Sequence, residues 1–182
     1  SDKMAALECK NHKYLESVTV SGAYIDLIDF SKCANLKNAN VHGSGSAIFK
    51  DCTSLVDLES SSGTNMPKLK KIDVSGCTLL QEINCQYNNL SSINLYGCTS
   101  LISLFCNDNN IETINLDNCS CNFLFCSNNR ITNIISPNNQ DIKEIDCRNN
   151  PIIKIDLSNC INLKEFHMTH NSGTNTDVNL NG

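Results

Sequence analysis

The sequence predicts a mainly β fold built as a repeat solenoid, in which one short unit stacks on copies of itself. The first observation is a segment, 80–98, whose pattern of apolar, cysteine and asparagine positions returns at 101–119. The second is an alternation of apolar and polar residues inside each unit, which is typical of β-strands. The third is the absence of reversing hairpins between successive copies, so equivalent strands should lie parallel. A fixed period in this range indicates a solenoid.

Eight units follow one another along the chain, which we treat as a single domain over residues 1–182. Alignment on the first apolar residue of each unit gives spacings between 19 and 25 residues. The units begin near Leu15, Leu36, Leu55, Leu80, Leu101, Cys121, Ile142 and Leu163.

Each unit contains two short extended segments. In the first, Ile83 and Cys85 should point inward and Asn84 outward. The second alternation, Ile93-Asn-Leu95, follows only about ten residues later, which is too short for a helix and two turns. We therefore expect the convex side to be extended or a short strand.

The first segment resembles the leucine-rich repeat family, whose hallmark is L-x-x-L-x-L-x-x-N/C-x-L. Leu101, Leu104, Cys106, Asn109 and Ile111 match these positions, with Cys where the third Leu usually stands. The short units, with their I-D/N-L endings, are similar to bacterial surface repeats that are broadly internalin-like. The resemblance implies a right-handed superhelix with a parallel concave sheet. It also implies a secreted or cell-surface binding module, with lipid anchoring through a missing N-terminal segment as one route.

Composition limits the class of partner. A net charge of -5 and a pI near 5.3 argue against non-specific nucleic-acid binding, which needs a basic surface. No apolar run approaches the length of a transmembrane segment. The opening Ser1-Asp-Lys-Met reads as a trimmed start, and we expect a monomer.

Ten of the twelve cysteines fall into two columns of the repeat. In-register side chains on parallel strands point the same way, whereas a disulfide needs Cβ atoms that face each other. We therefore expect free, buried thiols, with Cys121 beside Cys119 as the residue most open to pairing. Cys119-Ser-Cys121 lacks a second cysteine pair at zinc-ligand spacing. The columns are Cys33, Cys52, Cys77, Cys98, Cys119 and Cys160, and then Cys85, Cys106, Cys126 and Cys147.

Asparagine forms a further column, Asn88, Asn109, Asn129, Asn150 and Asn171. We expect a buried ladder whose amides satisfy backbone groups that strand pairing leaves open. The first three full units have other residues in this slot, which predicts a less regular N-terminal third.

A candidate recognition patch comes from the outward positions of the first segments. Phe105 and Phe125 occupy neighbouring units, and Phe123 shares their face. Exposed aromatic residues with a polar rim are typical of binding surfaces. Two alternatives remain open: the rings only cover each other, or Cys121 shifts the register and turns Phe123 inward. The candidate binding residues are Phe105, Phe123, Phe125, Asn84, Glu144, Asp146, Arg148 and His167.

Two other features carry weaker hypotheses. His167-Met-Thr-His170 lies near Asp146 and Glu165, but we expect a solvated edge, with no metal and no cofactor. Excursions at 60–68 and 171–175 leave from the same end of the strand. They either line the binding side or are tolerated insertions.

We expect a non-catalytic module that recognises a protein partner through the concave face. No nucleophile elbow or activated dyad suggests an enzyme. The alternatives are glycan binding, since aromatic faces stack on sugar rings, and a structural spacer within a larger surface protein. The sequence does not identify the partner.

Overall fold

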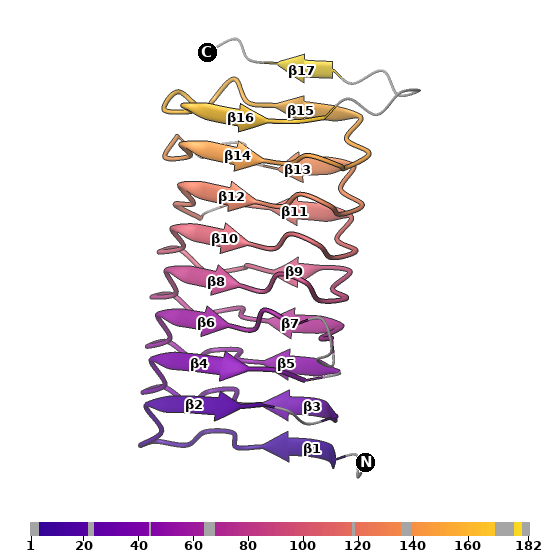
Figure 1. Cartoon of the computed structure of the whole chain (residues 1–182). Coiled ribbons are helices and arrows are strands. Elements are labelled where there is room, and N and C mark those ends of the chain that lie inside the picture. The colour runs from indigo at the N-terminus through magenta and orange to yellow at the C-terminus, as the bar shows by residue number, and fades with distance from the viewer. Residues whose placement is uncertain are drawn as a thin grey trace.

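The computed structural model is an all-β solenoid of stacked coils (Figure 1). It describes residues 4–21, 24–43, 45–63, 68–117, 119–135 and 140–169, together with the backbone of 177–179. Within these ranges no helix is long and apolar enough to cross a membrane. The stacked parallel strands confirm the predicted fold class.

One long side of the coil is an eight-stranded parallel sheet. Its strands, in spatial and sequence order, are β2 (Ser17–Val20), β4 (Asn38–Val41), β6 (Asp57–Glu59), β8 (Glu82–Asn84), β10 (Ser103–Phe105), β12 (Phe123–Phe125), β14 (Glu144–Asp146) and β16 (Glu165–His167).

The other long side carries shorter parallel sheets. A five-stranded sheet contains β1 (Met4–Glu8), β3 (Ile25–Asp29), β5 (Ser46–Ile48), β7 (Lys71–Asp73) and β9 (Ile93–Asn94). Two pairs continue it along the chain, β11 (Thr113–Asn115) with β13 (Asn133–Ile135), and β15 (Lys154–Asp156) with β17 (Asp177–Asn179). Short strands thus occupy the side where the sequence predicted extended chain or a short strand.

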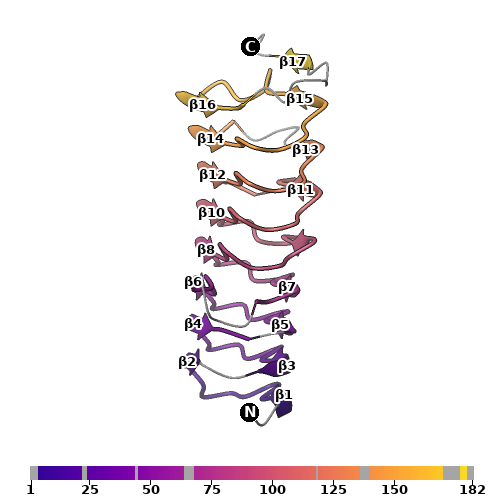
Figure 2. The same ribbon diagram turned by 45° about the vertical axis from the view of Figure 1, so that its right-hand side comes forward.

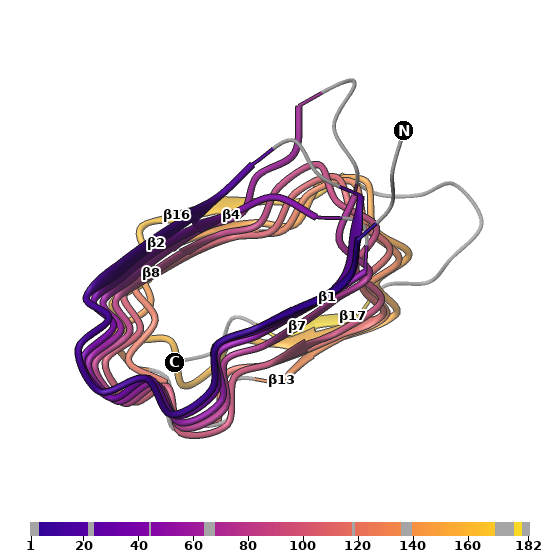
Figure 3. The same ribbon diagram turned by 90° about the horizontal axis from the view of Figure 1, so that it is seen from below.

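The coils lie almost directly above one another, as the turned view and the view along the stack show (Figures 2 and 3). The register explains this: Ile83 pairs with Leu104, Leu104 with Leu124, and Leu124 with Ile145. These side chains are fully buried between the two sheet sides. Equivalent residues of successive units therefore form continuous apolar columns, which are the core.

All twelve cysteines are free, including Cys121. Eleven are buried and Cys9 is half-buried. In the first column the thiols donate to backbone carbonyls of the preceding coil, as Cys52 does to Phe30 O at 3.1 Å and Cys98 to Val74 O at 3.3 Å. A thiol is a weak donor, and here it gives a second hydrogen bond to a carbonyl that already accepts a turn amide, as Phe30 O does from Cys33 N at 3.2 Å and Val74 O from Cys77 N at 3.1 Å.

The asparagine ladder is present at four of the predicted positions, Asn88, Asn109, Asn129 and Asn150, and Asn171 lies outside the described residues. Asn109 is typical. Its Nδ2 donates to Cys85 O at 2.9 Å and Cys106 O at 3.1 Å, and its Oδ1 accepts the Leu90 amide at 2.9 Å. One side chain therefore joins two consecutive coils.

Left-handed backbone residues stand directly before the ladder positions. Tyr87, Asp108, Asn128 and Asn149 have φ between 55° and 58°. Asn and Asp tolerate this region better than most residues. On the opposite side, Gly97 has φ +80°, and an added Cβ would lie 3.3 Å from the Gly76 backbone. These positions turn the chain sharply enough to close each coil.

Candidate binding surface

The outward side chains of the eight-stranded sheet form what we call the outer sheet face. Alternation along each strand places one or two residues on it, while the central residue enters the core. In β12, for example, Leu124 is fully buried and its two neighbours are half-buried. The face is therefore fixed by the same register that packs the core.

A stacked pair of phenylalanines lies in the middle of this face. Phe105 and Phe125 are direct register partners on β10 and β12. Their ring centroids are 5.1 Å apart and the ring planes differ by 8°. Both side chains are half-buried, so each ring keeps an accessible part. Rings that support each other in this way are held in one orientation before any ligand arrives.

Phe123 joins the same face from β12, beside Ser103 of β10. The alternative in which Cys121 shifts the register and turns Phe123 inward is wrong. Cys121 is fully buried in the slot that Leu101 and Ile142 fill in adjacent coils, and Phe123 remains half-buried. A small thiol thus replaces a larger apolar side chain without moving the strand.

Asp146 and Arg148 form a closed pair at one flank. Arg148 donates to both carboxylate oxygens, through Nε at 2.9 Å and Nη2 at 2.6 Å. These hydrogen bonds are the main reason why the pKa of Asp146 lies below its usual value. The sequence placed Asp146 among the contact residues, but its side chain is only 9% exposed, whereas that of Arg148 is 54% exposed. Asp146 therefore orients Arg148, because its own carboxylate is already occupied.

Asn84 occupies the other flank, on β8. Its Nδ2 donates to Glu59 Oε2 at 2.9 Å, and its Oδ1 accepts from Gln86 Nε2 at 3.1 Å. The second oxygen of Glu59 accepts the Ser61 amide at 2.7 Å. This polar chain fixes the amide of Asn84 beside the aromatic pair.

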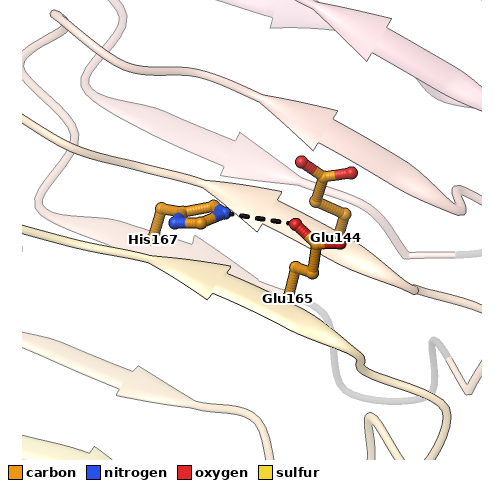
Figure 4. A group of neighbouring side chains, drawn as sticks. All are labelled: Glu144, Glu165 and His167. Carbon is orange, nitrogen blue, oxygen red and sulfur yellow. Dashed lines mark ion pairs between the residues drawn. The ribbon is translucent and has the colours of Figure 1, made fainter.

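Three ionisable side chains meet at the end of the sheet (Figure 4). His167 Nε2 lies 3.5 Å from Glu165 Oε2, and Glu144 completes a group whose ligand atoms lie within 4.8 Å of one another. Glu165 and His167 are exposed and Glu144 is half-buried. Structural metal sites usually have four enclosing ligands. We assign no metal to this open group, and His170 lies outside the described residues.

The first excursion begins as part of the sheet edge. Ser60 and Ser62 are buried, and their amides donate to Asn84 O at 2.7 Å and Gln86 O at 3.0 Å. Residues 64–67, and the whole of the second excursion at 171–175, lie outside the described residues. The hypothesis that both line the binding side therefore stays a prediction.

Two features of the site were missed by the sequence reasoning. One is the hydrogen-bonded chain from Ser61 through Glu59 to Asn84, which no motif announces. The other is the occurrence of two like-charged register pairs, Asp57 opposite Glu82 and Glu144 opposite Glu165. Its signal was present, because all four acids occupy the same position of the repeat.

Comparisons with known proteins give a distant structural likeness. No protein-family model matches the chain, and no curated protein matches it. The chain is similar to a solved structure, the functional domain of InlJ from Listeria monocytogenes, described as including a cysteine ladder. That alignment has 16% identity and a TM-score of 0.36, and covers 90% of this chain. The chain spans about half of that structure, 53% of its length. A likeness this distant assigns neither family nor function.

Proposed function

We propose that this protein is a non-catalytic binding module that recognises a protein partner through the outer sheet face. The observation that carries the proposal is the stacked Phe105–Phe125 pair, half-accessible at the centre of a sheet of eight parallel strands. Aromatic residues contribute a large share of binding energy at protein interfaces. A rigid strand framework also lowers the ordering cost of association.

The neighbouring residues have distinct roles in this proposal. Phe123 extends the apolar area along β12, and Arg148, oriented by Asp146, offers a fixed donor at the rim. Asn84 offers an amide held by Glu59 and Gln86. Glu144 and His167 lie on the two strands that continue the face. An apolar centre with a polar rim is the usual arrangement of a protein interface.

The test is the double variant Phe105→Ala, Phe125→Ala. Proteins captured from extracts of neighbouring or host cells are compared between this variant and the parent chain, and each candidate is then purified and titrated. We expect the variant to lose at least about tenfold in affinity, since two aromatic anchors are removed. Tyr96→Ala is the matched control, because Tyr96 is 79% exposed and follows β9 on the opposite side. A partner that binds the double variant as tightly as the parent would refute the proposal.

The same rings favour one second candidate, a glycan ligand. Sugar rings stack on aromatic faces, and the amides of Gln86 and Asn107 lie within hydrogen-bonding reach of each other at 3.3 Å, beside the aromatic pair. A glycan array separates the two functions. Saccharides that bind the parent chain and not the double variant would favour the glycan ligand, and an array without signals favours the protein partner.

We also propose that the protein acts in a secreted or cell-surface location, on the basis of the repeat resemblance described above. Fractionation of cells of the source organism, with an antibody against this chain, tests it. Detection confined to the cytoplasmic fraction would contradict the location without affecting the binding proposal.

A further inference from the structure

The outer sheet face is crowded with negative charge around the aromatic centre. Its eight strands contain six carboxylate residues and no lysine or arginine. The carboxylates are Asp57, Glu59 and Glu82 on one side of the rings, and Glu144, Asp146 and Glu165 on the other. Arg148 lies two residues after the end of β14, but it is engaged with Asp146.

Four of these acids face each other in like-charged register pairs. Asp57 lies opposite Glu82 on β6 and β8, and Glu144 lies opposite Glu165 on β14 and β16. Like charges directly opposite on neighbouring strands destabilise a sheet. Burial, with a smaller contribution from the charge of Glu59, raises the pKa of Asp57. The register therefore concentrates negative charge on this face.

The first pair has no counter-charge of its own. Within the described part of the chain, the Asp57 and Glu82 carboxylates make no hydrogen bond or ion pair. Lysines do precede three strands of the sheet. Lys37 is bound to Glu16 at 2.9 Å, while Lys143 and Lys164 stand directly before the other acidic pair. The Asp57–Glu82 pair is thus the part of the face that is best placed to attract a cation from outside.

A shallow pocket lies at this pair, lined by Val56, Asp57, Gln81, Glu82, Ile102 and Ser103. Its lining combines two carboxylates with two branched apolar side chains, and Ile102 is 39% exposed. A lysine or arginine can lay its methylene stem on apolar atoms while its charged end meets carboxylates. The pocket also adjoins the aromatic centre, because Ser103 is the register partner of Phe123.

We infer that the partner of the outer sheet face is a basic protein segment, which places a lysine or arginine in the Asp57–Glu82 pocket and an apolar side chain on the phenylalanines. This inference rests on the proposed function and specifies its partner. Complementary charge speeds association and selects against acidic partners. In the complex, the cation would offset the negative charges of Asp57 and Glu82.

The experiment selects a random 12-residue peptide library on the parent chain, after depletion on the Phe105→Ala, Phe125→Ala variant. We expect enriched peptides to combine lysine or arginine with aromatic or large aliphatic residues. Synthetic copies are then titrated against the parent, against Asp57→Asn, Glu82→Gln, and against Glu112→Gln, Asp117→Asn. The last is a control that removes two exposed charges on either side of β11, away from the face.

We expect the Asp57, Glu82 variant to lose about tenfold in affinity and the control to stay within about twofold, with affinity falling as salt screens the charges. Thermal denaturation verifies that both variants fold; removing the like-charged pair should keep or raise the melting temperature. Enriched peptides that are neutral or acidic, equal binding to all three proteins, or no enrichment would each overturn the inference. Binding that depends on the phenylalanines but not on Asp57, Glu82 or salt would overturn it and leave the proposed function intact.

Discussion

The single residue that does most to connect the coils is the ladder asparagine. An amide side chain has two donor hydrogens and one acceptor oxygen, and Asn109 uses both kinds of group on backbone atoms. The acceptor serves the amide two residues after the preceding ladder position, so the interaction joins neighbouring coils. Asparagine suits this slot because it is short, neutral and able to serve donor and acceptor at once.

Replacement of Asn109 by alanine should therefore be costly. The change leaves the buried Leu90 amide without its acceptor. The Cys85 and Cys106 carbonyls each lose one donor but keep another, Asn88 Nδ2 at 3.1 Å and Asn129 Nδ2 at 2.9 Å. We expect a loss of about 2 kcal/mol in the free energy of unfolding, since one buried group left without a hydrogen bond costs about 1–3 kcal/mol. Urea denaturation followed by circular dichroism measures it. The neighbouring Asn110→Ala is the control, with an expected change below about 0.5 kcal/mol; equal losses in the two variants would contradict the ladder's role.

The elements of the fold followed closely from sequence. The eight strands of the large sheet lie where the L-x-x-L-x-C alternation placed them, because a two-residue period leaves only one way to bury both Ile83 and Cys85. The opposite strands also match their I-D/N-L signal. There the polar residue stabilises the turn that follows, since the side chains of Asp73 and Asp156 accept the amides of Ser75 and Ser158 at 3.0 Å.

The surface was less predictable than the strands. Alternation showed that Phe105 and Phe125 share a face, and the stacked rings agree with it. It could not show that Asp146 would be enclosed, because Arg148 reaches back over it in a way that depends on side-chain conformation. The outward position of a residue in a strand does not determine how exposed its side chain is to solvent.

The buried thiols of the two cysteine columns lead to a prediction about their reactivity. Burial raises the pKa of the Cys98 and Cys147 thiols to about 12 and that of Cys119 to about 11. Only the thiolate reacts, and these thiols are also sterically enclosed. We expect Ellman's reagent at pH 8 to detect no more than the half-buried Cys9 in the native protein, and all twelve thiols after denaturation in guanidinium. Rapid reaction of several thiols in the native state would contradict the packing.

The whole molecule is a one-dimensional stack in which each coil contacts only its neighbours. Deletion of residues 80–100 would remove one complete coil and join Leu79 to Leu101, which restores the same register with β10 against β6. We expect this variant to keep its β circular dichroism and to unfold cooperatively. Its urea m-value should fall by about a tenth, in proportion to the surface lost. Loss of cooperative unfolding would show that the coils are not equivalent.

The direct superposition of coils also sets the geometry available to a ligand. Chemical groups on the outer sheet face can be separated along the stack only by whole strand steps of about 4.8 Å. The separation between the acids Asp57 and Glu82 on β6 and β8 and the phenylalanines on β10 and β12 is thus a count of coils, not a continuous distance. Inserting or removing one unit would change the spacing between such groups by one strand step, and would therefore change which partners fit.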